Sequence, residues 1–350
     1  MRGKVKMRYF HWHDIKALAW FFISTMADAA TQLPELSSGE QAALVARLGR
    51  ESFARRVAMQ QMLEADPESD EAGPINVQRI VRRMRVLAGL VRAIGLAERG
   101  RRNMLDIHQR ENVLRLRGLP PVFRGARLLH LSDLHADIDA EIVPAVIRAI
   151  GDWEYDAVVL TGDYRAHTHH EWATALKLCG ALARSLRSGV PVFAILGNHD
   201  PLEMVPGLEL LGWRVLLNEA APWKKGGASL WFAGVDDDHT YHNADIFRAS
   251  AAMPAGSCAI LLSHTPTLYK QAADAGFAGF LCGHTHAGQI CLPGGFVLLN
   301  NAHGAPRRII RGAWQEGTVS GYTSAGAGAC RIPARFFCPP EITRHTLEPA

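Results

Sequence analysis

The sequence predicts an α/β fold with four layers, α/β/β/α, preceded by an N-terminal helical extension. Three observations predict it. After residue 111, short apolar runs that end in polar loops alternate with helical patterns. Later apolar runs follow one another directly, which favours two sheets packed face to face with helices outside. The first third of the chain carries helical patterns instead, so we expect a helical region at 1–110 and an α/β domain at 111–350.

The N-terminal region contains two helical patterns separated by a linker. The first begins at Ser38 and runs to about Ala65, and a polar segment bounded by Pro and Gly follows at 66–74. The second has one apolar stripe, Ile80, Met84, Leu87, Val91 and Ile94, spaced at steps of four and three. Arginines 79, 82, 83, 85 and 92 occupy much of the remaining surface. A basic amphipathic helix is typical of a membrane-surface or partner helix; the alternative is that the stripe packs on the α/β domain.

Positive charge gathers in the same region. Residues 1–125 carry 21 Lys and Arg against 13 Asp and Glu, whereas the remainder carries 17 against 21. This asymmetry suggests an acidic surface as the partner of residues 1–105, either nucleic acid or an anionic membrane. Nucleic acid is not expected, because the interleaved aromatic residues of a stacking platform are missing.

The chain is expected to be cytoplasmic, peripheral on the inner membrane. Its most apolar N-terminal run, 17–26, is shorter than the roughly 20 residues of a membrane-spanning helix. The leader before that run is long and polar, so export by a signal peptide is not expected. The six scattered cysteines contain no C-x-x-C pair and favour reduced, mostly buried thiols.

In residues 111–350 the apolar runs predict the strands, and the polar loops that follow them contain the candidate functional residues. Strands are expected at 113–117, 127–131, 157–160, 192–196, 213–217, 229–235, 259–262, 279–281 and 296–299, and helices at 142–150 and 172–186. Ligands in such sheets collect outside the carboxyl ends of the strands. Five motifs follow these runs: Asp133-x-His135, Gly162-Asp163, Gly197-Asn198-His199-Asp200, His264 and Gly283-His284-Thr285-His286.

The motifs supply two carboxylates, one amide and four imidazoles, a set sized for two metal ions. Two metals about 3.5–4 Å apart can lower the pKa of a shared water and clamp both oxygens of an in-line displacement. Imidazole suits Zn and Fe, and carboxylate suits Mn and Mg. One carboxylate must bridge the metals, and Asp163, alone after an apolar strand and a glycine, is the natural candidate.

From Glu111 onward, the order of these motifs resembles the calcineurin-like metallophosphoesterase superfamily. Three further marks resemble a bacterial branch: 131–135 (LSDLH), 262–266 (LSHTP), and the tail at 321–326, 333–335 and 338–342. That branch includes general phosphodiesterases and lipid A pathway hydrolases that cleave UDP-2,3-diacylglucosamine. Asp137 departs from the small residue usual there.

The resemblance implies a role for each motif residue. Asp133, His135 and His286 would bind the first metal; Asn198, His264 and His284 would bind the second; Asp163 would bridge both; and His199, held by Asp200, would be the general acid. The cofactors would be two divalent ions, Mn²⁺, Fe²⁺ or Zn²⁺. Arg165 and His167, close to Asp163 in the sequence, are candidate substrate contacts. The acidic segment at residues 236–239 is expected to form a turn.

We therefore expect hydrolysis of a phosphodiester or pyrophosphate bond by metal-bound hydroxide. UDP-2,3-diacylglucosamine at the membrane surface is the leading single substrate. The main alternative is a soluble phosphodiesterase acting on nucleotides or other small diesters, and an alternative of another class is a non-catalytic, metal-bound scaffold. If the basic region serves the membrane alone, deleting residues 1–105 should spare cleavage of small diesters.

Overall fold

A computed structural model describes residues 32–65, 89, 95–169, 171–297, 302 and 304–350. The predicted leader, the linker and the basic stripe from Ile80 to Ile94 lie outside these residues. Among the helices that the structure describes, none is both long and apolar enough to cross a membrane.

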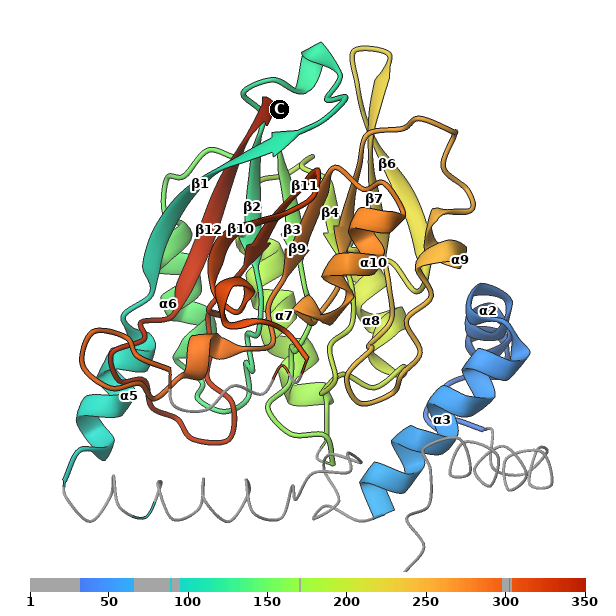
Figure 1. Cartoon of the computed structure of the whole chain (residues 1–350). Helices are drawn as coiled ribbons and strands as arrows, with labels where there is room; N and C mark the ends of the chain where they lie inside the picture. The colour runs from blue at the N-terminus through green and yellow to red at the C-terminus, as the bar shows by residue number, and fades with distance from the viewer. Residues whose placement is uncertain (1–31, 66–88, 90–94, 170, 298–301, 303) are drawn as a thin grey trace, which may run out of the picture.

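The described part of the catalytic domain is built on two six-stranded sheets (Figure 1). The first has the order β1 (His108–Leu116), β12 (Glu341–Pro349), β2 (Arg127–Leu131), β3 (Ala157–Leu160), β4 (Val192–Ala194) and β5 (Arg214–Val215). The second has the order β10 (Gly312–Glu316), β11 (Val319–Thr323), β9 (Gly279–Cys282), β8 (Ala259–Leu262), β7 (Ala228–Gly234) and β6 (Glu219–Lys225). In each sheet the central strands run parallel, so their carboxyl ends lie at one edge.

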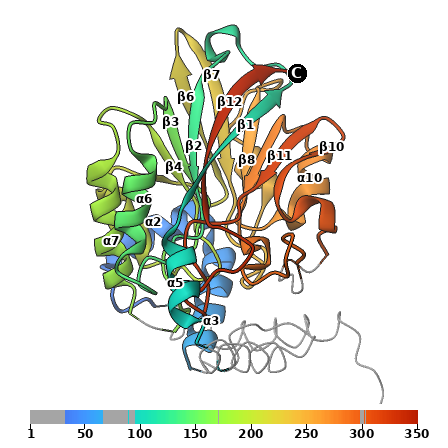
Figure 2. The same cartoon turned by 90° about the vertical axis from the view of Figure 1, so that its left-hand side faces the viewer.

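Helices cover the outer face of each sheet, as Figure 2 shows. Those on the first sheet are α6 (Ile142–Ile150), α7 (Ala173–Ser185) and α8 (Met204–Leu210); those on the second are α9 (Ile246–Ser250) and α10 (Tyr269–Asp274). Short 3₁₀ turns occupy Pro121–Phe123, Pro266–Leu268, His286–Gly288 and Arg307–Ile309. Between the sheets, Phe193 packs on Phe232 with ring centroids 4.5 Å apart, in a core shared by both. The predicted four-layer sandwich is confirmed.

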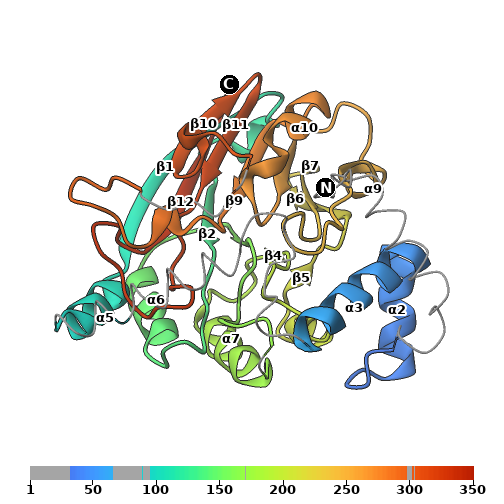
Figure 3. The same ribbon diagram turned by 60° about the horizontal axis from the view of Figure 1, so that its bottom comes forward.

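Three described helices precede the domain: α2 (Ser38–Leu48), α3 (Arg50–Ala65) and α5 (Ala97–Leu105). The predicted helix from Ser38 to Ala65 is present but is divided at Gly49, whose φ of 82° favours glycine. Ser37 caps α2, because its side chain accepts a hydrogen bond from the Glu40 backbone N–H. Leu48 and Val57 share a hydrophobic cluster with Val205 of α8, so α2 and α3 pack on the catalytic domain (Figure 3).

The strands predicted most accurately are those buried on both faces. β2, β3 and β8 have the predicted bounds, and all of β3 and β8 is buried. The strand predicted at 296–299 is wrong at Phe296, which makes only an isolated bridge with Leu292. β6, β10, β11 and β12 were not predicted, because their polar and small residues give no continuous apolar run.

Candidate dinuclear metal site

Loops at the carboxyl ends of the parallel strands bring all seven predicted metal ligands into one place. Asp133 and His135 follow β2, Asp163 follows β3, Asn198 follows β4, His264 follows β8, and His284 and His286 follow β9. All seven side chains are buried, none exposed by more than 7%. The site therefore combines residues that lie up to 153 positions apart along the chain, from Asp133 to His286.

Asp163 lies between two groups of donor atoms. Its Oδ2 is 3.5 Å from His135 Nε2 and 3.3 Å from His264 Nε2. On the first side, His286 Nε2 is 3.1 Å from His135 Nε2 and 3.5 Å from Asp133 Oδ1. A single carboxylate oxygen within reach of both histidines is what a bridging ligand requires.

On the second side, Asn198 contributes a neutral oxygen. Its Oδ1 lies 3.1 Å from His264 Nε2 and 3.0 Å from His284 Nδ1. The Nδ1 of His284 and the Nε2 of His264 are themselves 3.2 Å apart. Two lone-pair nitrogens and an amide oxygen that converge in this way fit a divalent cation far better than they fit one another.

The backbone at the site is held in unfavourable conformations. Asp133, His135, Asp163, His284 and His286 all have positive φ, between 40° and 67°. Such residues cost about 1–3 kcal/mol each and persist where the surrounding structure enforces them. The loops are also closely packed: a Cβ on Gly197 would lie 2.1 Å from Asp163 Oδ1. The turn after each strand thus aims its side chain into the site.

Backbone carbonyls fix the orientation of two imidazoles. His135 Nδ1 lies 2.8 Å from the carbonyl oxygen of Arg165, and His264 Nδ1 lies 2.7 Å from that of Thr161. Since a carbonyl only accepts, both Nδ1 atoms carry a proton, and each Nε2 faces the site. This second contact is typical of metal-binding histidines, so the donor set fits two divalent metals.

Burial shifts the pKa values in the site. Desolvation raises the pKa of Asp163 to about 7, and it lowers that of His135 to about 3. Desolvation also disfavours a charged His264, but the carboxylates of Asp163 and Asp133 outweigh it and raise its pKa to about 10. The carboxylates therefore create a negative field that attracts positive charge.

A buried chain of hydrogen bonds reaches Asp133 from the edge of the first sheet. The links are Asn112 Nδ2 to His345 Nδ1 at 2.9 Å, His345 Nε2 to His130 Nδ1 at 3.3 Å, His130 Nε2 to Thr161 Oγ1 at 2.9 Å, Thr161 Oγ1 to Ser132 Oγ at 2.7 Å, and Ser132 Oγ to Asp133 Oδ2 at 2.6 Å. An amide N–H begins the chain and a carboxylate ends it, so every group donates toward Asp133. The chain holds Oδ2 and leaves Oδ1 facing His286.

His199 stands beside the predicted ligands. Its Nε2 lies 3.9 Å from Asp163 Oδ2 and 3.8 Å from Cys330 Sγ. The expectation that Asp200 holds the His199 ring is wrong in its detail, because His199 Nδ1 has no hydrogen-bond partner. The Asp200 carboxylate instead accepts backbone N–H groups from Asp163, Tyr164, Arg165 and Gly197, which joins the loop after β3 to the loop after β4.

The two candidate substrate contacts lie in different environments. Arg165 is 1% exposed, and its guanidinium donates to the carbonyls of His199 and Thr168. His167 is partly exposed, with its ring 5.9 Å from that of His169. Asp137 accepts a hydrogen bond from the Ala166 N–H.

Sequence reasoning missed two residues at this site. The His239 ring lies 4.4 Å from the ring of His284, and Cys330 Sγ lies within 4.8 Å of donor atoms of both His135 and His286. His239 follows β7 at the same sheet edge as the predicted ligands, which was the available signal. Cys330 gave no signal, since it lies in the tail far from any predicted strand.

Fold and site together define a metal-dependent phosphoester hydrolase. Residues 126–288, a little under half of the chain, match the family model described as calcineurin-like phosphoesterase. Both the predicted family and the predicted need for divalent metals are confirmed.

The relatives include proteins named as a metallophosphoesterase and as a phosphodiesterase. The chain is 27% identical over 258 residues to the uncharacterised metallophosphoesterase YkuE of Bacillus subtilis, covering 69% of this chain and 86% of that protein. It is 25% identical over 230 residues to the phosphodiesterase YaeI of Escherichia coli, covering 62% and 80%. A phosphopantetheinyl hydrolase structure from Mycobacterium tuberculosis aligns at 12% identity and a TM-score of 0.37, covering 59% and 92%.

Proposed function

We propose that the protein hydrolyses phosphodiester bonds, with the seven predicted residues as ligands of two metals and His199 as the general acid. The single observation that carries the proposal is the position of Asp163 Oδ2, within 3.5 Å of the facing nitrogens of both His135 and His264. The relative named as a phosphodiesterase supports the choice of a diester.

Each part of the site has a separate task in this reaction. Two bound divalent ions would supply Lewis acidity and lower the pKa of a water. Asp163 holds the two halves of the ligand set together, and the chain through Ser132 orients Asp133. His199, whose Nε2 lies 3.9 Å from Asp163 Oδ2 and whose Nδ1 has no hydrogen-bond partner, is placed to donate a proton to the leaving oxygen.

The test is hydrolysis of bis(4-nitrophenyl) phosphate by the full chain with added Mn²⁺. Asp163→Ala should lose bound metal and activity together. His199→Ala should keep two metals per chain and lose about 10²- to 10⁴-fold in kcat, the usual contribution of general acid–base catalysis. A wild-type protein that is loaded with metal yet inert toward diesters would refute the proposal and favour the non-catalytic scaffold.

We further propose UDP-2,3-diacylglucosamine as the first natural substrate to assay. Support comes from the sequence: the branch resemblance, and the basic amphipathic pattern between residues 79 and 94, which suits an anionic membrane. Incubation with this lipid should release UMP. No UMP release, with diester cleavage intact, would leave the soluble phosphodiesterase as the better description.

Membrane binding needs its own experiment. The full chain should sediment with vesicles containing phosphatidylglycerol, and replacing the arginines at 79, 82, 83, 85 and 92 by glutamine should release it, because each basic residue near the surface contributes about 1 kcal/mol. Equal binding by both proteins would exclude the basic segment as the membrane contact.

A further inference from the structure

The segment that carries the predicted general acid is held from outside by helix α3. Arg56 donates through Nη2 to the carbonyl oxygen of Asp200 at 2.8 Å. Four residues further along the helix, Gln60 Oε1 accepts a hydrogen bond from the Leu202 N–H at 3.2 Å. The Gln60 amide also donates to both carboxylate oxygens of Glu203, at 3.0 and 2.7 Å. The helix therefore contacts the three residues 200, 202 and 203 that follow His199.

These contacts are deeply buried, unlike those of ordinary surface helices. Arg56 is fully buried and Gln60 is 1% exposed. A charge in this position is costly unless it is paired and hydrogen-bonded. Arg56 has both kinds of partner: its Nε lies 3.3 Å from Asp236 Oδ2, and its guanidinium stacks 3.1 Å from the centre of the Tyr241 ring. A protein that needed α3 only for packing could use apolar side chains here.

The same guanidinium connects the two sides of the candidate site. Asp236 and Tyr241 bound the loop that carries His239, whose ring lies against His284. Asp200 belongs to the loop that carries His199. Arg56 therefore contacts both the loop that carries His199 and the loop that carries His239.

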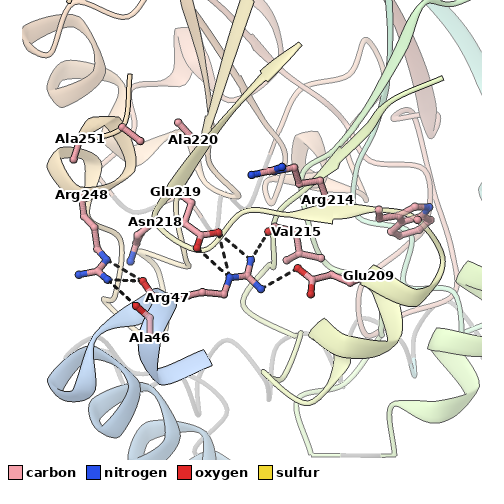
Figure 4. A pocket seen from close by; sticks show the side chains of 13 residues that line it. Ala46, Arg47, Glu209, Arg214, Val215, Asn218, Glu219, Ala220, Arg248 and Ala251 are labelled. Carbon is pink, nitrogen blue, oxygen red and sulfur yellow. Dashed lines mark hydrogen bonds and ion pairs between the residues drawn. The ribbon is translucent and has the colours of Figure 1, made fainter. Parts of the chain in front are cut away.

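α2 and α3 are anchored firmly enough for such a role. Figure 4 shows Arg47, near the end of α2, between Glu209 and Glu219, with nitrogen–oxygen distances of 2.9 and 3.0 Å. Arg248 of α9 donates to the carbonyl oxygen of Arg47, which closes the end of α2 (Figure 4). The end of α2 is thus fixed to α8, which covers the first sheet, and to β6 and α9, which belong to the second sheet and its helices.

We infer that α3 belongs to the catalytic apparatus: Arg56 and Gln60 are positioning residues that place His199 for proton donation. This rests on the proposed function, in which His199 protonates the leaving oxygen. Both residues precede the segment that matches the family model, residues 126–288. On this inference, deletion of residues 1–105 removes α3 and should impair cleavage of small diesters, whereas the sequence alone led us to expect that the deletion would spare it.

The test compares two diesters that differ in the leaving group. Release of 4-nitrophenolate needs little protonation, whereas phenol is a poor leaving group that depends on a general acid. Arg56→Lys keeps the positive charge but removes the planar guanidinium with its several N–H donors. Gln60→Met removes the amide group and nearly keeps the side-chain volume. For diphenyl phosphate we expect kcat to fall roughly 10- to 100-fold, the scale of a misplaced catalytic group. For bis(4-nitrophenyl) phosphate the fall should be much smaller, with KM and metal content near wild type.

Neighbouring residues supply matched controls. Arg55→Lys and Gln61→Met make the same chemical changes on the same helix, but Arg55 donates to Asn243 and Gln61 to the carbonyl of Gln32. Both controls should behave as wild type. Equal losses on the two diesters, no loss on either, or a fall that follows lost metal would overturn the inference. A wild-type protein inactive on both diesters would instead refute the proposed function, so the two failures are distinguishable.

Discussion

The buried pair His130 and His345 predicts a specific loss of stability in acid. Burial lowers the pKa of His130 from 6.5 to about 3, and burial next to His130 lowers that of His345 as well. Below pH 6.5 the unfolded chain therefore binds protons that the folded chain does not, so the free energy of unfolding falls as the pH falls. The stabilising contribution is fully present above the unfolded pKa.

The magnitude for His130 follows from this difference. Because its folded pKa lies far below the range considered, the loss approaches 1.4 kcal/mol per pH unit, or about 2 kcal/mol between pH 6.5 and pH 5. His130→Leu removes this titration. The variant should be less stable at pH 8, because Thr161 and His345 lose a partner, but its deficit should shrink by about 2 kcal/mol by pH 5.

The assay is urea unfolding over this pH range, with a chelator present so that metal binding does not contribute. The other histidines are common to both proteins, and their contributions cancel in the difference, except for His345, whose pKa His130 helps to lower. Thr161→Val is the matched control: it removes the two hydrogen bonds that Thr161 Oγ1 makes in the chain but keeps both imidazoles, so its deficit should be constant with pH. A His130→Leu deficit that also stays constant would show that His130 is not held neutral, and would refute the reasoning.

Three further predictions concern residues that support the site. Ser132→Ala removes the hydrogen bond to Asp133 and should weaken metal affinity about 10- to 100-fold in titrations of chelator-stripped protein; unchanged affinity would contradict the chain. Gly283→Ala places a Cβ 2.2 Å from Asp133 Oδ2 and should lose metal, whereas Gly39→Ala, with open space around it, should not. Arg335→Lys should lower the free energy of unfolding by about 2–4 kcal/mol, because a lysine cannot replace its hydrogen bonds to several buried carbonyls; an unchanged midpoint in urea would refute this.

The fold was predictable where burial leaves a simple pattern. β3 and β8 are buried along their whole length, and each reads as an apolar run that ends at a candidate ligand. β12 could not be found in this way. Its sequence mixes polar with apolar residues. Its parallel partner β1 lies more than 230 positions earlier, with His108 opposite Glu341. Only tertiary pairing makes this segment a strand.

The residues of the candidate site also fall into two groups, those that the sequence predicts and those that it does not. Its donor residues follow strands, so the sequence predicts them, but the groups that orient them are ordinary residues elsewhere. His130 reads as one polar residue in an apolar strand, and the sequence offers no sign of its partner His345. Arg56 and Gln60 did leave a signal: with Phe53 and Val57 they form an i, i+3, i+4, i+7 stripe, and polar residues on such a stripe are expected to be buried.

The distribution of these residues has a consequence for the whole chain. Metal ligands placed in strained turns stay there only if neighbouring elements enforce the conformation. Here Asp200 joins two ligand loops through backbone N–H groups, and α3 in turn holds the carbonyl of Asp200. The motif residues alone therefore do not specify a working site. A family member that keeps all five motifs but has a different N-terminal region must hold this loop by other contacts, and its leaving-group preference should differ accordingly.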